Sequence, residues 1–314
     1  MRVVAALGGN ALQRRGEPLD AKHAARNVHA ATAVLAELAV EHELVVTHGN
    51  GPQMGLLALQ SELYRDTRAY PLDVLGAESQ GMIGYLLERE LANALPSRQV
   101  VSLLTETVVD ALDPAFRRPS TPVGPVYEEA EARKLARERG WTVAADREGW
   151  RRVVASPVPR SVVELPTIEL LLAHGAVVVC AGGGGVPIVI DSQCMRHGVE
   201  AVVDKDATTA LLARHLRADV LLLLTDVPAV ELDFGTSHAR PLHETTTREL
   251  LAHEFAAETM GPKVAAATSF VTVTGRRAAI GALADAVALV HGTAGTQVRF
   301  AEPEMLTPIG GASA

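Results

Sequence analysis

Three stretches of the sequence each join a short apolar run to a turn rich in glycine or asparagine, a combination that suits phosphate binding. They read V-V-A-A-L-G-G-N from Val3, L-V-V-T-H-G-N-G-P from Leu44 and V-V-V-C-A-G-G-G-G-V-P from Val177. Glycine lacks a Cβ and can take positive φ, so an anion can come within hydrogen-bond reach of the backbone N–H groups of such a turn. One such turn is typical of any α/β protein, but three of them favour a phosphate site.

The apolar runs are predicted to be the strands that bring these turns together. If the three strands belong to one parallel sheet, their ends lie on the same edge, where open α/β sheets bind ligands. The second turn, from His48 to Pro52, also precedes a predicted helix, whose N-terminus would add partial positive charge. Asparagine suits these turns because it tolerates left-handed backbone and supplies a neutral donor.

A lysine between two aspartates, Asp204-Lys205-Asp206, precedes a helix predicted over 207–216. Asp204 could cap that helix and Asp206 could be an acid of its first turn, which are both structural roles. Neither role explains the lysine, which is unfavourable beside the positive end of a helix. The pattern therefore indicates a functional cation next to a glycine-rich turn.

The periodicity of apolar residues predicts the remaining elements. We expect strands at 2–7, 43–47, 99–105, 177–180, 219–225, 277–280 and 296–300, and helices at 21–40, 73–94, 164–173, 207–216, 246–253 and 260–273. A patch of small residues from Ser79 to Gly84 interrupts the second helix, and helix packing or a dimer face explains it at least as well as ligand contact. From Ala301 onward we expect a mobile tail.

The pattern changes between residues 113 and 159. Prolines at 114, 119, 122, 125, 157 and 159 enclose a charged helical piece at 128–139 and a polar, hairpin-like piece around 150–154. Proline punctuation at both ends marks an excursion from the main sheet. We interpret 113–159 as a protruding lid subdomain inserted within a single domain that spans 1–314, although its basic residues could equally form an ordinary solvated face.

Composition limits the class of protein. The 314 residues are 48% hydrophobic and 21% charged, the balance of a globular protein with a substantial core. A net charge of −8 without a basic run argues against nucleic acid as a partner, whereas a nucleotide needs only local positive charge. No apolar run reaches the roughly 20 residues of a membrane helix, no leader pattern precedes the first strand, and two cysteines make no disulfide framework. The expected location is the cytoplasm.

Together these pieces resemble the carbamate kinase family of the amino-acid kinase superfamily over nearly the whole chain. The resemblance begins with A-L-G-G-N-A at Ala6, and its strongest matches are H-G-N-G-P-Q at His48, Q-G-M-I-G-Y at Gln80, G-W-R-R-V-V at Gly149, C-A-G-G-G-G-V-P at Cys180, G-V-E-A-V-V-D-K-D at Gly198 and P-K-V at Pro262. It implies an α/β fold, a three-layer αβα sandwich around an open, mainly parallel sheet of about eight strands with a small protruding subdomain, and a homodimer.

The resemblance also implies an activity, the reversible transfer of a phosphoryl group between ATP and carbamate, which gives ADP and carbamoyl phosphate and is used to make ATP in arginine catabolism. By resemblance, the catalytic residues are Lys205, Asp206 and Lys263, with the two lysines clamping the transferred phosphoryl group and Asp206 orienting them. The residues on the carbamoyl phosphate side are Gly8, Gly9, Asn10, Gly49, Asn50, Gly51, Gly183 and Gly184. Those beside the nucleotide are Thr225, Asp226, Met260 and Lys263. Mg²⁺ would arrive with the nucleotide and be held through phosphates and water, without a metal site of the protein itself.

The sequence departs from the family at two places. Carbamate kinases usually carry a lysine where this chain has Thr121, and that lysine is expected to cover carbamoyl phosphate when the lid closes. We hypothesise that Arg117, Arg118 or Arg152 substitutes for it. The family's Gly-Ser before Met260 is here Glu258-Thr259, which brings an acid near the nucleotide loop.

Other functions remain open from the sequence alone. A kinase for another acyl carboxylate is disfavoured because no lysine lies in the stretch 6–10, where those relatives usually have one. A sensor of carbamoyl phosphate or nucleotide without catalysis is disfavoured because Lys205, Asp206 and Lys263 are retained. A dinucleotide-binding dehydrogenase is weaker still, because no G-x-G-x-x-G follows the first strand. We interpret His48 as a structural residue, since carbamate is already anionic and needs no general base.

Overall fold

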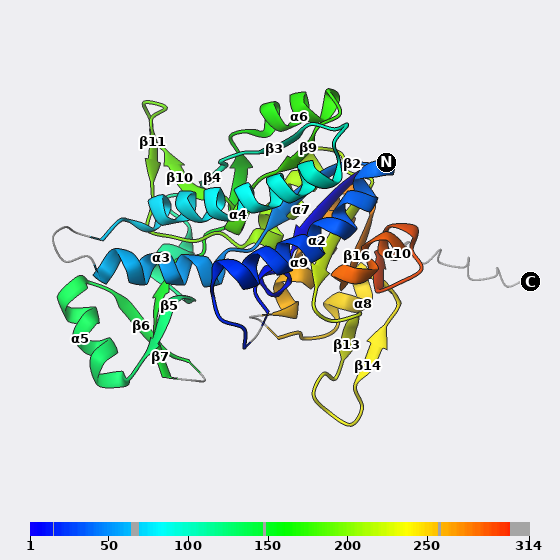
Figure 1. Ribbon diagram of the computed structural model, residues 1–314. Helices are drawn as coiled ribbons and strands as arrows, with labels where there is room; N and C mark the ends of the chain where they lie inside the picture. Colours follow the sequence, from blue (N-terminus) through cyan, green and yellow to red (C-terminus); the bar gives the residue numbers. More distant parts are fainter. Residues whose placement is uncertain (15, 64–68, 147–148, 257–258, 302–314) are drawn as a thin grey trace, which may run out of the picture.

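A computed structural model describes residues 1–14, 16–63, 69–146, 149–256 and 259–301 (Figure 1). The chain folds around one eight-stranded sheet. In spatial order its strands are β15 (Glu244–Thr246), β17 (Thr296–Arg299), β16 (Arg277–Ala282), β12 (Val220–Thr225), β1 (Arg2–Leu7), β2 (Glu43–His48), β9 (Val177–Val179) and β3 (Val100–Ser102). All neighbours pair in parallel except β16 and β17, so the predicted mainly parallel sheet is confirmed.

Helices cover both faces of this sheet because its central strands are apolar on both sides. In β1, Val3, Ala5 and Leu7 join one buried cluster, and Val4 and Ala6 join the other. The first cluster is covered by α2 (Ala21–Glu41), α4 (Leu72–Ala94) and α10 (Ala286–His291). The second is covered by α6 (Leu165–Ala173), α7 (Lys205–His215) and α9 (Met260–Thr274). The predicted three-layer sandwich is therefore the observed fold.

The single strand predicted over 99–105 is wrong, because the chain passes from the main sheet to a second sheet after β3. The chain leaves the main sheet after β3, and β4 (Glu106–Val109) lies in a four-stranded sheet with β8 (Pro159–Val162), β10 (Val186–Ile190) and β11 (Arg196–Gly198). The side chain of Gln80, on α4, binds the backbone between β3 and β4. Its Oε1 accepts from the N–H of Thr105 at 2.9 Å and its Nε2 donates to the carbonyl of Thr105 at 3.1 Å. The side-chain amide takes the place of a strand partner at this point.

The region between β4 and β8 forms a separate unit. Strands β5 (Thr121–Tyr127), β7 (Gly149–Val154) and β6 (Thr142–Asp146) make an antiparallel three-stranded sheet. Helix α5 (Glu129–Arg139) packs on this sheet and ends at Gly140, whose φ of 70° is left-handed. Figure 1 shows this unit at the lower left, apart from the main sheet. We call residues 121–154 the protruding subdomain; the short 3-10 helix η1 (Pro114–Arg117) precedes it.

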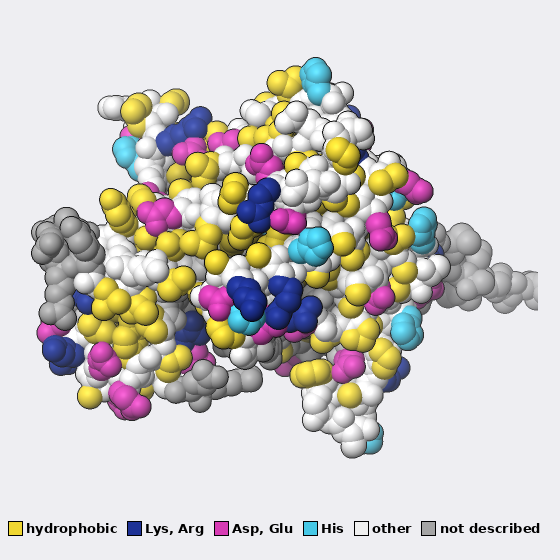
Figure 2. Space-filling model, in the orientation of Figure 1, with side chains coloured by type: hydrophobic (Ala, Val, Ile, Leu, Met, Phe, Trp, Pro, Cys, Tyr) yellow, Lys and Arg dark blue, Asp and Glu magenta, His cyan; other side chains and the backbone are white. Residues whose placement is uncertain are grey.

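The remaining elements are short or peripheral. They are α1 (Gly9–Leu12), α3 (Gly51–Leu63), α8 (Thr247–Leu251), the strands β13 (Val230–Leu232) and β14 (Arg240–Leu242), and the 3-10 helices η2 (Gly182–Gly184) and η3 (Leu283–Asp285). In the described part of the chain, no helix is both long and apolar enough to cross a membrane. Figure 2 shows basic and acidic side chains interspersed on the face that it displays. The mobile tail expected from the sequence falls on 302–314, outside the described residues, and stays a prediction.

Candidate active site

The glycine-rich turns meet at the carboxyl edge of the main sheet. They follow β1, β2 and β9, which are neighbours in the sheet order. Their contact is so close that side chains would not fit. A Cβ on Gly49 would lie 3.0 Å from the nitrogen of Gly9 and 3.5 Å from Cδ of Lys205, and one on Gly183 would lie 2.1 Å from Nδ2 of Asn50. The structure thus brings together the three turns that the sequence predicted to converge.

The tetraglycine turn needs its glycines for conformation as well as for space. Gly183, Gly184 and Gly185 have φ values of 62°, 91° and 88°, in the left-handed region. A Cβ on Gly184 would lie 2.3 Å from the carbonyl oxygen of Val203, the residue before Asp204. The turn is therefore packed directly against the segment that leads into α7.

Buried threonines hold the tetraglycine turn in place. The hydroxyls of Thr107 and Thr208 both donate to the carbonyl of Gly184, at 2.8 and 3.0 Å. The next residue of α7, Thr209, donates to the carbonyl of Lys205 at 2.5 Å and lies 2.6 Å from the hydroxyl of Thr47. Sequence reasoning missed these residues. The signal that could have found them is a pair of threonines inside a helix, one turn after a functional lysine.

Asp206 joins the two predicted lysines. Its Oδ1 lies 2.5 Å from Nζ of Lys205 and its Oδ2 lies 3.0 Å from Nζ of Lys263. Helix α7 begins at Lys205, two residues earlier than predicted, with Asp204 as the N-cap that accepts from the N–H of Ala207 at 2.8 Å. Lys263 comes from the first turn of α9. The N-terminal ends of two neighbouring helices thus present two ammonium groups on one carboxylate.

Burial makes this cluster electrostatically strong. The side chains of Lys205, Asp206 and Lys263 are 13%, 4% and 11% exposed. Burial lowers the pKa of Lys205 below its ordinary value, and the charge of Lys263 also lowers it, against the opposing effect of Asp206. Burial alone would raise the pKa of Asp206, but both lysines outweigh it and hold this pKa below the ordinary value. Charges in such a site interact more strongly than charges in water.

His48 is a neutral, buried residue. It is 1% exposed, and burial, followed by the charge of Lys205, lowers its pKa to about 4 even though its contact with Gly49 works in the other direction. Its Nδ1 lies 3.1 Å from the carbonyl oxygen of Gly49, and a Cβ on Gly182 would lie 2.4 Å from its ring. The ring therefore packs between two of the glycine-rich turns, in agreement with the structural role expected from the sequence.

The residues predicted to bind nucleotide lie at the same edge, but on different faces of the sheet. Thr225 ends β12 and donates to Oδ1 of Asp226 at 3.1 Å. Both line a cavity of about 390 Å³ on the α2 face, which also contains Asn27, Arg14 and Leu283. Met260 begins α9 on the opposite face and packs partly against the core. The side chain of Asn10 and residue Glu258 lie outside the described part, so their predicted roles are untested.

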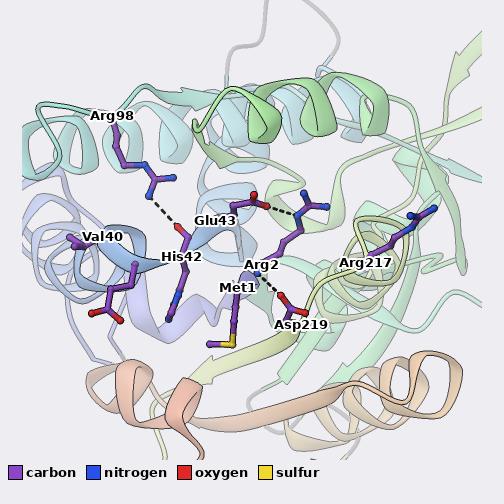
Figure 3. A pocket seen from close by; sticks show the side chains of 9 residues that line it. Met1, Arg2, Val40, His42, Glu43, Arg98, Arg217 and Asp219 are labelled. Carbon is purple, nitrogen blue, oxygen red and sulfur yellow. Dashed lines mark hydrogen bonds and ion pairs between the residues drawn. The ribbon is translucent and has the colours of Figure 1, made fainter.

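Another cavity lies at the opposite edge of the sheet (Figure 3). It measures about 490 Å³ and is lined by charged residues, but several of them are already engaged. Arg2 pairs with Glu43 at 2.8 Å, and its backbone N–H donates to Asp219 at 2.8 Å. Arg98 donates to the carbonyls of His42 and Ala39. These contacts secure the ends of α2 and of the strands, which is a structural role.

The protruding subdomain lacks a cation at the family position, as the sequence indicates. Thr121 pairs with Val154 at the root of the subdomain. Of the three hypothesised substitutes, Arg152 is already bound, with its guanidinium 2.8 Å from Glu200. Arg117 and Arg118 are exposed at the end of η1.

Comparisons with known proteins identify relatives of this chain. A model of the amino acid kinase family matches residues 1–282. The carbamate kinase of Rhizobium meliloti is 52% identical, covering 94% of this chain and 92% of the relative. That of Pyrococcus furiosus is 45% identical, with coverage of 95% and 98%. Among solved structures, carbamate kinase from Giardia lamblia bound to AMP-PNP has a TM-score of 0.89 at 37% identity, covering 96% of this chain and 98% of that one.

Proposed function

This chain belongs to the amino acid kinase family, and from that premise we propose how its residues perform the reaction of its carbamate kinase relatives. The chain catalyses phosphoryl transfer between ATP and carbamate. In such transfers the protein does little covalent work, so catalysis depends on alignment of the reacting oxygens and on stabilising the charge of the moving phosphoryl group. The lysine cluster and the glycine-rich turns meet those two requirements.

Lys205 and Lys263 neutralise the oxygens of the transferred phosphoryl group. The observation that carries this assignment is their common partner, because Asp206 binds both ammonium groups with separate oxygens. The carboxylate keeps two like charges close together before substrate arrives, at little cost in reorganisation. Asp206 is thus a positioning residue, and its substitution would affect catalysis by displacing both lysines.

The glycine-rich turns hold the carbamoyl phosphate side through backbone N–H groups. The N–H groups of Gly8 and Gly49 already donate to the carbonyls of Leu224 and Leu7, at 2.9 and 3.0 Å, so these two glycines contribute space, whereas Gly9 and Gly51 begin α1 and α3. Asn50 is fixed by its donation to Ser79 at 2.8 Å. The tetraglycine turn supports the path of the phosphoryl group, with Gly183 against Asn50 and Gly184 against Val203. No proton has to leave carbamate, which is consistent with a neutral His48.

Magnesium enters with the nucleotide in this proposal. Among the described residues there is no group of three or more side chains suited to hold a metal ion, and both oxygens of Asp206 are bound to lysines. Backbone N–H donors cannot coordinate a cation. With ligands from phosphate oxygens and water, as Mg²⁺ prefers, the ion would add positive charge beside the lysines.

The nucleotide is proposed to lie beside Thr225, Asp226 and Met260. Thr225 ends β12 and Asp226 follows it, next to Gly8, whose N–H donates to the carbonyl of Leu224 at 2.9 Å. That contact joins the end of β12 to the first glycine-rich turn. A nucleotide at this point would direct its phosphates toward the lysine cluster.

Turnover of carbamoyl phosphate with MgADP tests the proposal. We expect ATP formation by the wild-type chain and a loss of about 100- to 1,000-fold with Lys205→Ala, since removing one preorganised charge-stabilising group costs that much. Binding of carbamoyl phosphate without ATP formation would instead support the sensor. An equally active Lys205→Ala variant would refute the assigned role.

Three further expectations follow from family membership. We infer a homodimer, and exposed apolar side chains on α4 and after β3, namely Met82, Tyr85 and Leu104, are available for an interface. A monomeric mass by light scattering would refute the dimer. The role in making ATP during arginine catabolism and the cytoplasmic location stay predictions.

A further inference from the structure

Glu200 connects two parts of the molecule that are separate in sequence. Its Oε2 lies 2.8 Å from Arg152 of β7, in the protruding subdomain. Its Oε1 accepts from the backbone N–H of Leu72, the first residue of α4, at 3.0 Å. The carboxylate therefore has one oxygen on the subdomain and the other on the main body.

Arg152 is itself held on the subdomain. Its guanidinium lies 4.9 Å from the ring centre of Trp141, and Arg139 stacks on the same ring at 4.9 Å. Arg139 in turn pairs with Glu62 of α3 at 2.7 Å. Two arginines on one tryptophan thus each reach a carboxylate of the main body, and stacking restricts the motion of both guanidinium groups.

The segment after Glu200 leads directly to the lysine cluster. Ala201 bridges to Ala155 at the end of β7, and the N–H of Val202 donates to the carbonyl of Ala155 at 3.0 Å. Val203 packs against Gly184, and Asp204 then caps the helix that begins with Lys205. Glu200 lies five residues before Lys205, and almost every residue between them makes a contact. A displacement of Glu200 would therefore be transmitted to Lys205.

The residues just before Glu200 are also closely packed on α4. A Cβ on Gly198 would lie 1.7 Å from Oδ2 of Asp73. With Leu72 bound to Glu200, the first turn of α4 contacts the segment twice, so the segment has little freedom to move without its neighbours.

We propose that Glu200 is a positioning residue that couples the protruding subdomain to the segment carrying Lys205. When the subdomain is seated, Arg152 fixes the carboxylate, and the carboxylate fixes the segment against α4 and the tetraglycine turn. This inference rests on the proposed function and on the expectation from the sequence that the subdomain closes over carbamoyl phosphate. It assigns Arg152 to a fixing role in place of the missing lid cation.

The test is a double-mutant cycle with Arg152→Met and Glu200→Gln, assayed by ATP formation from carbamoyl phosphate and MgADP. Glutamine keeps an oxygen for the N–H of Leu72 but loses the charge. We expect Glu200→Gln to raise the KM for carbamoyl phosphate about two- to fivefold, the range of a partly exposed ion pair, with the KM for MgADP unchanged. The double variant should be no worse than the worse single variant.

The matched control is Glu129→Gln, which removes the same charge from a pair with Arg133 inside the subdomain, at 2.7 Å, and should leave both constants unchanged. Additive effects in the cycle, or equal rises in both KM values, would refute the coupling and leave only a general structural role. An inactive wild-type chain would instead refute the proposed function, so the two failures are distinguishable.

Discussion

The carboxyl edge of the main sheet and the protruding subdomain are held in place by different means. At the edge, turns are fixed by backbone geometry, with positive φ at three successive glycines and a carbonyl bound by two buried threonines. Besides the packing of α3 on β5, the subdomain meets the body through two ion pairs, Arg152 with Glu200 and Arg139 with Glu62, around Trp141. Side chains on the surface release a contact more easily than a buried backbone does.

This difference matches the demands of the reaction. Phosphoryl transfer needs donors that do not move as charge develops, whereas substrate must enter and leave past whatever covers it. A small buried cluster that includes Met54, Leu75, Val123 and Val154 joins the subdomain to α3 and α4. We therefore expect changes at the edge to abolish activity and changes in the subdomain to adjust it.

The largest effect should come from Lys263→Ala. Loss of an ammonium group that is 11% exposed removes preorganised charge, and we expect kcat to fall about 100- to 1,000-fold. Lys134→Ala is the control from the subdomain, where the side chain is 66% exposed, and its kcat should stay at the wild-type value. Similar losses for the two variants, by steady-state ATP formation, would contradict the contrast between the regions.

Glycine-to-alanine substitutions in the two regions should lower the free energy of unfolding by different amounts. Gly140→Ala places a side chain at a φ of 70° with no atom within 4 Å, so only the left-handed backbone opposes it, at about 1–2 kcal/mol. Gly184→Ala meets the same kind of strain and also the carbonyl of Val203 at 2.3 Å, which should add about 1–3 kcal/mol. Urea unfolding measures both free energies. Equal losses of stability would show that the tetraglycine turn can move away from Val203, which would contradict a rigid carboxyl edge.

The pH dependence of turnover should report on Asp206. Because the pKa of Lys205 is lowered by burial, its ammonium form is lost at lower pH than that of a free lysine, and activity should fall on the alkaline side accordingly. Asp206 raises this pKa, so Asp206→Asn should move the alkaline fall to still lower pH. Glu129→Gln removes a carboxylate from the subdomain and should leave the profile unchanged. A profile of Asp206→Asn that overlays the wild type would argue against Lys205 as the titrating group.

The smallest effect should be that of Thr121→Lys. This substitution restores the cation that the family usually carries on the subdomain, and we expect the KM for carbamoyl phosphate to fall about two- to fivefold, the range of one partly exposed charge. Ser120→Lys adds the same charge on the exposed residue just before β5, outside the family position, and should not lower the KM. Equal effects of both variants would mean that net charge alone matters.

Much of the main sheet could be predicted from the sequence. Buried parallel strands are continuous apolar runs, so the sequence predicts β1, β2, β9 and β12, and the glycine-rich turns after β1, β2 and β9 indicate the binding edge. The strand β10 was missed, although its sequence V-P-I-V-I is rich in β-branched residues, because it directly follows the tetraglycine turn and contains a proline. The break after β3 depends on the side chain of Gln80, which lies 25 residues away in the chain.

The sequence by itself determined the chemistry of this protein, because glycine turns after apolar runs and a lysine between two aspartates are local patterns. Only the tertiary structure decided how these parts are joined. Asp206 reaches Lys263 across 57 residues, and Glu200 reaches Arg152 across 48. Such contacts depend on the packing of whole helices and sheets. No local pattern can specify them, because the partner of a charged side chain is set by the fold around it.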